Sequence, residues 1–208
     1  MSWELWIAFA VASAALLAVP GPTVLVVVSY ALGKGRSSAW ATVPGVTLGD
    51  FVAMTVSLLG AGALLAASAT LFTALKLAGA AYLVWLGVKL WRARPESQDL
   101  ASAGARLDSR RMFWNSFVVT ALNPKSIVFF IAFVPQFVDP AGPLAPQFVI
   151  LEATFLSLAA IIVLIWAVLA GRLRARFQRP ATLRLVNRVG GSFLIGAGLL
   201  TAVARRAT

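Results

Sequence analysis

Long apolar runs, separated by short polar or basic segments, dominate this chain. Each run has about the twenty residues that a helix needs to cross the ~30 Å hydrocarbon core of a bilayer. We predict six transmembrane helices, with expected bounds of about Trp3 to Leu32, Ala39 to Leu65, Ser68 to Trp91, Met112 to Val134, Gln147 to Ala170 and Val186 to Val203. The fold class is therefore all-α integral membrane, with residues 1–208 forming one membrane domain.

The two halves of the chain repeat short patterns in the same order. Three matches carry this interpretation: residues 18–24 with 121–127, where Pro22 aligns with Pro124; Asp50 with Glu152; and Gly79 to Gly87 with Gly190 to Gly198. An odd number of spans in each half would insert the second half upside down, as in many transporters. The pattern predicts two inverted three-helix repeats, about 1–91 and 112–208, joined by a cytoplasmic loop, 92–111.

Basic residues are concentrated in three of the five connections between the predicted spans. They are Lys34 and Arg36; Arg92, Arg94, Arg106, Arg110 and Arg111; and Arg172, Arg174, Arg176, Arg179, Arg184 and Arg188. The other two connections have no Lys or Arg, and the Pro-rich one, 135–146, carries Asp139. Because cytoplasmic loops are enriched in Lys and Arg, we predict a multi-pass protein with both termini outside.

Composition narrows the function classes. With 60% hydrophobic and 12% charged residues and a mean hydropathy of +0.88, a soluble domain could not cover its apolar side chains. The net charge of +11 does not indicate a nucleic-acid partner, since the basic residues lie between apolar runs. The chain has no Cys and no His, which excludes thiolate sites and His-based catalysis. We expect no metal, no cofactor and no enzymatic activity.

Two helix-breaking motifs occur inside predicted spans. Pro20, Gly21 and Pro22 interrupt the first, and Asn123 with Pro124 interrupts the fourth. Proline lacks the N–H that a helix needs, so carbonyls such as those of Ala18 and Val19 are released. In hydrocarbon these groups must face protein, water or a ligand. Paired breaks in corresponding places indicate a transport site, and a packing kink is the alternative.

Four charged residues lie within the predicted spans. Asp50 and Lys125 are near the bilayer centre, whereas Lys76 and Glu152 are shallower. An ionised group at the centre costs at least ~2.5–3.5 kcal/mol and should be paired or hydrated. Asp50 could pair with Lys76 or Lys125. In the functional interpretation the lysines receive a carboxylate or an acid exchanges protons, and structural ion pairs are the alternative.

Glycines favour close helix contacts in the second span. Gly45 and Gly49 form a GxxxG pattern directly before Asp50. This spacing places both glycines on one helix face, where a neighbouring backbone can approach. Simple packing is the favoured interpretation, and a homodimer through such a face stays open.

These motifs together resemble those of the LysE/RhtB family of bacterial amino-acid exporters. The resemblance rests on Pro20-Gly21-Pro22, Gly45 and Gly49, the block from Lys76 to Gly87 with Gly79 and Tyr82, the block from Asn123 to Ser126, and Pro135 to Phe137. It covers nearly the whole chain and implies a translocator in the cytoplasmic (inner) membrane of a bacterium that expels amino acids or their derivatives. The Asn-Pro-Lys-Ser block is similar to the homoserine/threonine branch.

The expected function is secondary active export by alternating access, with proton coupling. The half-helix that begins at Pro22 would bind the substrate carboxylate, and Asp50 with Glu152 would hold the amino group or carry a proton. A membrane channel and a membrane-embedded enzyme are the alternatives. The predicted pathway residues are Pro20, Gly21, Pro22, Gly45, Gly49, Asp50, Lys76, Gly79, Tyr82, Asn123, Pro124, Lys125 and Glu152.

Overall fold

A computed structural model describes residues 1–67, 69–92, 108–139 and 142–172, and also residues 184, 185, 188, 189, 191, 192, 195, 196, 199, 202 and 203. Across these residues the regular elements are helices, and no strand is present. The α-helices are α1 (Trp3–Ala18), α2 (Pro22–Lys34), α3 (Ala39–Ala67), α4 (Ala69–Arg92), α6 (Ser109–Ala121), α7 (Pro124–Ala132) and α8 (Leu144–Arg172). Two short 3₁₀ helices, η1 (Gly35–Ser38) and η2 (Val134–Phe137), follow α2 and α7.

The first and fourth predicted spans are each broken into two helices at the predicted prolines. α1 and α2 are separated before Pro22, and α6 and α7 before Pro124. α3, α4 and α8 match the second, third and fifth predicted spans to within a few residues. Half of the residues of the predicted sixth span lie outside the described residues, as does most of the loop 92–111.

Two connections are shorter than the sequence suggested. Pro146, predicted as loop, lies in the first turn of α8, where proline is tolerated because its missing N–H has no partner there. α6 begins at Ser109 instead of Met112, because Asp108 caps it: the Asp108 side chain accepts a 2.8 Å hydrogen bond from the Arg111 N–H.

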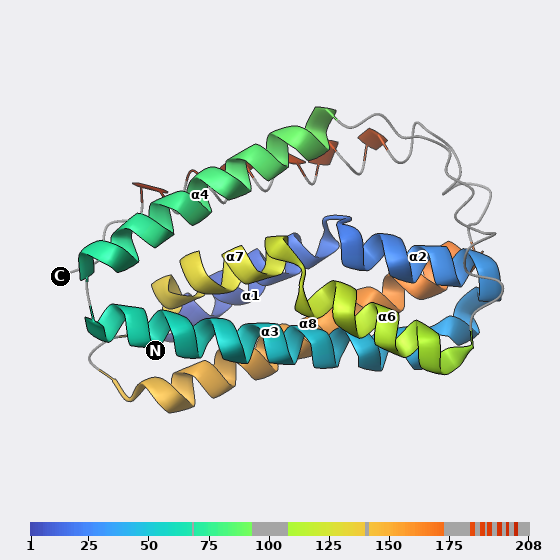
Figure 1. Cartoon of the computed structure of the whole chain (residues 1–208), viewed down its shortest axis with the longest axis horizontal. Helices are drawn as coiled ribbons and strands as arrows, with labels where there is room; N and C mark the ends of the chain where they lie inside the picture. Colours follow the sequence, from blue (N-terminus) through green and yellow to red (C-terminus); the bar gives the residue numbers. More distant parts are fainter. Residues whose placement is uncertain are drawn as a thin grey trace.

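The helices form a bundle in which corresponding elements run in opposite directions (Figure 1). α1 and α2 run one way along the bundle and α6 and α7 run the other, with both breaks near its middle. α3 and α8 are likewise opposed. α3 packs against α6, α7 and α8, and α8 also packs against α1 and α2. α3 and α8 therefore hold the two broken helices together.

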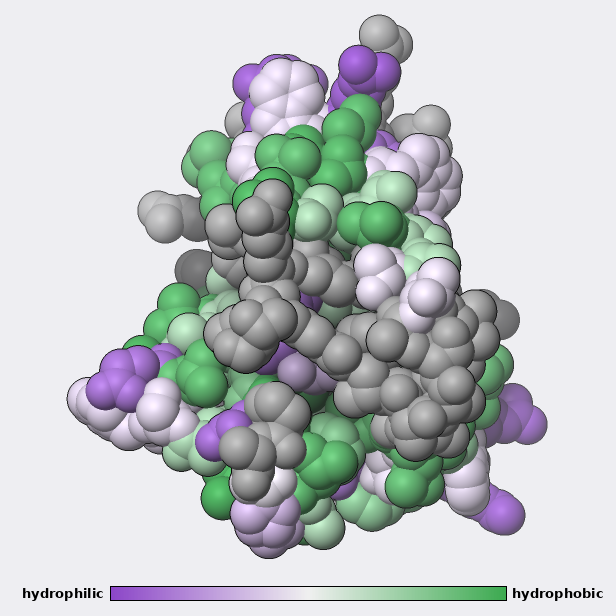
Figure 2. All heavy atoms as spheres, turned by 90° about the vertical axis from the view of Figure 1, so that its left-hand side faces the viewer, coloured by the Kyte–Doolittle hydropathy of each residue, from purple (hydrophilic) through white to green (hydrophobic). Residues whose placement is uncertain are grey.

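Both faces of α8 are apolar, which distinguishes it from a helix of a soluble protein. Its inward face buries Leu151, Phe155, Ala159, Val163 and Ala167. Its exposed face is equally apolar and carries Val149, Ile150, Ile161, Leu164, Ile165 and Leu169. The end-on view in Figure 2 also shows hydrophobic side chains over much of the coloured surface. A helix that is apolar all round requires an apolar solvent on its outer face, and lipid supplies one.

Length and apolar character single out a few stretches of the described chain as able to cross a membrane. These are the helical stretch Pro22–Gly60, the helix Leu144–Ala170 and, taken as one bent span, the pair Ser109–Ala121 and Pro124–Phe137 with its 43° bend. α1 is a shorter apolar helix. The chain is thus an all-helical protein with membrane-compatible helices, and the count of six spans stays a prediction.

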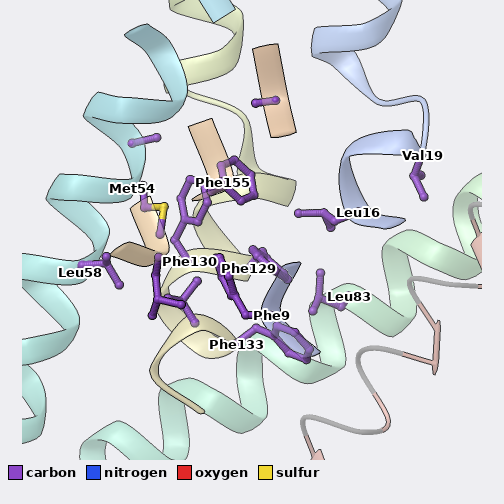
Figure 3. Close-up of a cluster of buried hydrophobic side chains, with 14 residues drawn as sticks. Phe9, Leu16, Val19, Met54, Leu58, Leu83, Phe129, Phe130, Phe133 and Phe155 are labelled. Atoms are coloured by element: carbon purple, nitrogen blue, oxygen red, sulfur yellow. The ribbon is translucent and has the colours of Figure 1, made fainter. Parts of the chain in front are cut away.

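Two large hydrophobic clusters lie inside the bundle, besides a smaller one of Tyr30, Ala41 and Met112. The first, here called the aromatic cluster, contains the buried residues Phe9, Leu16, Val19, Ala53, Met54, Leu58, Leu83, Phe129, Phe130, Phe133, Val134, Leu151, Phe155 and Ala159 (Figure 3). The second, the aliphatic cluster, contains Val24, Val27, Val28, Ala31, Leu32, Ala39, Val46, Val163, Ala167 and Ala170. The two share the same long helices, so they occupy successive levels along the bundle.

Candidate functional site

The first break follows directly from the prolines. In an α-helix the Leu16 carbonyl would accept from the N–H of residue 20, but residue 20 is proline and has none. α1 ends at Ala18, where the Val19 N–H turns back to the Leu16 carbonyl at 3.2 Å. Gly21 is extended, and Pro22 occupies the first turn of α2, the position that proline suits best. The end of α1 therefore carries carbonyls with spare acceptor capacity.

The second break has the same design with a different cap. Asn123 is the N-cap of α7, and its side-chain oxygen accepts a 3.1 Å hydrogen bond from the Lys125 N–H. Pro124 occupies the first turn of α7 as Pro22 does in α2. Gly21, which caps α2, has no side chain to do the same. At the second break the N-terminus of α7 therefore has a side-chain cap, whereas at the first break the N-terminus of α2 has none.

Lys125 connects the second break to the first. Its side chain is only 6% exposed, and its Nζ donates to the Leu16 carbonyl at 3.1 Å and to the Val19 carbonyl at 3.0 Å. The sequence predicted that released carbonyls would need a partner near Val19, and Val19 is one of the two. The other is the Leu16 carbonyl, whose donor in an uninterrupted helix would be the N–H of residue 20, a proline.

Thr23 makes the reciprocal contact from the first break to the second. Its hydroxyl oxygen accepts hydrogen bonds from the Asn123 Nδ2 at 3.1 Å and the Thr120 hydroxyl at 3.2 Å. Thr23 follows Pro22 as Lys125 follows Pro124. In each half, the residue after the helix-starting proline therefore contacts the break of the other half.

Gly21 leaves the space that the Lys125 side chain occupies. A Cβ placed on Gly21 would lie 3.3 Å from the Lys125 Nζ and 3.4 Å from its Cε. The separation from Nζ is slightly tighter than ordinary van der Waals contact, so a side chain here would press on the ammonium group. Glycine at this position is explained by close approach, since its backbone is in the extended region.

Asp50 is the second buried charged side chain near the breaks. It is 2% exposed, and its Oδ1 has no hydrogen-bond partner. The charges of Asp50 and Lys125 interact electrostatically, but within the described residues they form no ion pair. Of the two partners that the sequence left open for Asp50, Lys125 donates its ammonium N–H groups to backbone carbonyls. The Lys76 side chain lies outside the described residues.

Two buried hydroxyl groups resemble Asp50 Oδ1 in lacking a hydrogen-bond partner in the described structure. They are Ser13 Oγ on α1 and Ser116 Oγ on α6. Buried polar atoms are nearly always satisfied, so such groups suggest places where water or a ligand binds. Thr23, Asp50, Thr120, Asn123 and Lys125 are here called the polar centre.

The polar centre lies between the two hydrophobic clusters. Along α3, Asp50 falls between Val46 of the aliphatic cluster and Met54 of the aromatic cluster. Along the first broken helix, Thr23 falls between Val19 and Val24, which belong to the aromatic and the aliphatic cluster respectively. In the described part of the bundle, apolar side chains therefore lie on both sides of the polar centre along the bundle axis.

Glu152 has a separate partner. Its Oε1 accepts a 2.6 Å hydrogen bond from the Thr55 hydroxyl, which joins α8 to α3. The side chain is partly buried. Glu152 is one turn before Phe155 of the aromatic cluster, so it lies beside that cluster and not in the polar centre.

The predicted glycines pack helices together within the chain. A Cβ on Gly45 would lie 2.5 Å from the Phe113 carbonyl oxygen, and one on Gly49 would lie 2.8 Å from that of Phe117. Both neighbours belong to α6. α6 therefore covers the helix face that carries Gly45 and Gly49, and a homodimer stays a prediction.

The predicted residues of α4 lie elsewhere. A Cβ on Gly79 would lie 2.6 Å from the Ala132 Cβ, so α4 closely approaches α7 there. Tyr82 packs its ring against Trp85, with 5.5 Å between ring centroids. Neither contact involves the polar centre.

Thr23 and Thr120 were missed by the sequence reasoning. A threonine in an apolar span commonly bonds its own helix, so it gives little signal alone. The internal repeat could have indicated Thr23, since aligning Pro22 with Pro124 also aligns Thr23 with Lys125. Nothing comparable singles out Thr120.

Broken apolar helices that enclose a buried, charged centre define a membrane transport protein. Comparison with known proteins agrees, since the family model described as "LysE type translocator" matches residues 14–205. The chain belongs to the LysE family of amino-acid efflux transporters, which confirms the resemblance found in the sequence. Members of this family are transporters and not enzymes.

Several curated proteins are similar over most of their length. A homoserine/homoserine lactone efflux protein of Salmonella typhi is 34% identical over 100% of both chains. A leucine efflux protein of Enterobacter sp. is 28% identical over 87% of each chain. An uncharacterized membrane protein of Vibrio cholerae is 32% identical over 99% of this chain and 100% of its own. No solved structure matches the chain.

Proposed function

We propose that this chain is a secondary active exporter of amino acids or amino-acid derivatives in the bacterial inner membrane. The observation that carries the proposal is the meeting of two broken helices around buried Lys125 and Asp50. Such charges are costly in a membrane and are retained where a polar solute or ion must pass. Family membership and the efflux names of the relatives support the same function.

At the first break, the C-terminal end of α1 and the N-terminal end of α2 complement the two charges of a zwitterion. α1 ends there with the Leu16 and Val19 carbonyls, and the negative end of its dipole favours a cation. α2 begins there without a side-chain cap, and its first N–H groups and positive dipole end favour an anion. An ammonium group would bind at the end of α1 and a carboxylate at the start of α2.

Transport would proceed by alternating access of two inverted repeats. The opposed directions of α1–α2 and α6–α7, and of α3 and α8, support this arrangement (Figure 1). The aromatic and aliphatic clusters would serve as the two gates, since each covers one side of the polar centre. Asp50 would carry the coupling proton, with Glu152 as the matching acid of the second repeat.

The orientation of the protein would place its basic end in the cytoplasm. In Figure 1 the end of α2, the start of α6 and the end of α8 lie at the same end of the bundle. Those helix ends carry Lys34, Arg110, Arg111 and Arg172. The positive-inside rule then places the N-terminus outside.

Homoserine is the first substrate to test, because the relative named for homoserine efflux is more similar than the one named for leucine efflux. Purified protein in liposomes should exchange labelled homoserine for internal unlabelled homoserine, saturably. An imposed proton gradient should drive its accumulation. Homoserine passing without exchange would indicate a channel, and a chemically altered product would indicate an enzyme. Either result would contradict the proposal.

Asp50→Asn tests the proposed coupling. The variant should retain homoserine exchange and lose accumulation driven by the proton gradient, because an amide cannot carry the proton. Asp108→Asn is the matched control: the same change at an exposed helix cap, where asparagine caps equally well. Unchanged proton-driven accumulation in Asp50→Asn would remove Asp50 from the coupling mechanism.

A further inference from the structure

The Lys125 ammonium group occupies a site made of backbone alone. Its Nζ donates to the Leu16 carbonyl at 3.1 Å and the Val19 carbonyl at 3.0 Å, and among the described residues it forms no ion pair. The two carbonyls lie at the C-terminal end of α1, where Val19 is the C-cap and Pro20 has no N–H to donate. The C-terminal end of a helix dipole favours any cation placed there.

A free amino acid carries the same chemical group. Its α-ammonium has one positive charge and three N–H donors on a tetrahedral nitrogen, as a lysine side chain does. A site that satisfies one satisfies the other, provided that the alkyl chain behind the nitrogen has room. Here Gly21 supplies part of that room, since a Cβ on it would lie 3.3 Å from the Lys125 Nζ.

The surroundings favour a single cation. Asp50 is 2% exposed, has an unpartnered Oδ1 and interacts electrostatically with Lys125 without contacting it as an ion pair. A second ammonium beside Lys125 would meet like-charge repulsion in a buried environment, whereas one that replaced Lys125 would keep the same charge balance with Asp50. The two ammonium groups would therefore compete for the carbonyls.

We infer that the Leu16 and Val19 carbonyls form the subsite that binds the substrate ammonium group. When no substrate is bound, the Lys125 ammonium group occupies this subsite. This inference rests on the proposed export function and names the part of the site that recognises the amino group. Substrate binding displaces the Lys125 ammonium from the carbonyls, and substrate release returns it.

Whether the affinity for homoserine rises or falls when Lys125 is replaced tests the proposed role of Lys125. Lys125→Met keeps much of the side-chain volume and removes the competing ammonium, so labelled homoserine should bind the purified variant more tightly than wild type, by roughly tenfold. The reason is that a site blocked for most of the time binds with an apparent affinity reduced by its free fraction. Weaker binding would instead show that Lys125 receives the substrate carboxylate, which would overturn the inference.

A second variant tests the subsite without any transport substrate. Lys125→Ala keeps the Cβ and removes the three carbons and the ammonium group beyond it, so n-propylammonium should bind in the space they leave and raise the melting temperature of the detergent-purified variant, or increase the folded fraction recovered. n-Propanol lacks the charge and tetramethylammonium lacks N–H donors, so neither should act. Wild type and Lys34→Ala, which removes an exposed lysine at the end of α2, should gain nothing.

The outcomes separate this inference from the proposed function. If homoserine binds neither wild type nor Lys125→Met, the proposed substrate is wrong, and the propylammonium result still decides on the subsite. If Lys125→Ala gains neither stability nor folded protein from propylammonium, the carbonyl pair is no ammonium subsite, whatever the protein transports.

Discussion

Adding one methyl group at Gly49 tests the packing that positions the polar centre. A Cβ on Gly49 would lie 2.8 Å from both the Phe117 carbonyl oxygen and the Thr120 Cβ. Ordinary contact begins near 3.4 Å, so α3 and α6 must separate by about 0.6 Å or more. Such overpacking costs about 1–3 kcal/mol, against a gain of about 1 kcal/mol because alanine favours a helix over glycine.

We therefore expect Gly49→Ala to lower the free energy of unfolding by up to about 2 kcal/mol, which is about 1–3 kcal/mol below a variant that gains only the helix propensity. Homoserine exchange should fall with it, since Thr120, which donates to Thr23, is pushed aside. Reversible unfolding in mixed micelles, followed by tryptophan fluorescence, measures the first effect. Exchange into liposomes, corrected for the amount of folded protein, measures the second.

Gly60→Ala is the matched control on the same helix. No atom lies within 4 Å of a Cβ placed on Gly60, so only the helix-propensity gain remains. This variant should be as stable as wild type or more stable, by up to about 1 kcal/mol. If Gly49→Ala is as stable as Gly60→Ala, the close contact of α3 with α6 is not what holds this part of the bundle.

Two further substitutions test the aromatic cluster and the second break. Phe130→Ala removes a fully buried ring that packs edge-on against Phe155 at 4.9 Å, and should cost about 3 kcal/mol in the same micelle assay; a cost below about 1 kcal/mol would show that the ring is not tightly packed. Asn123→Ala removes the α7 cap and a bond to Thr23, and should cost about 1–2 kcal/mol. Because Thr23→Val removes that same bond, the double variant should lose less than the two single losses combined, and full additivity would contradict the contact.

Local chemistry made part of this structure readable from the sequence. Proline lacks an N–H whatever surrounds it, so Pro20, Pro22 and Pro124 fixed where the first and fourth spans break. Long apolar runs likewise require lipid, and the motifs sufficed to find the family. Charged residues within such runs must be buried or hydrated, and Asp50 and Lys125 are indeed buried.

Only the tertiary structure decided which of these groups meet. Lys125 contacts carbonyls that lie 109 and 106 positions earlier in the chain, and not the Asp50 carboxylate that charge alone favoured. Thr23 joins the polar centre through Asn123, 100 positions away. Such partners depend on the register in which helices pack, and many residues set that register together, so no single motif encodes it.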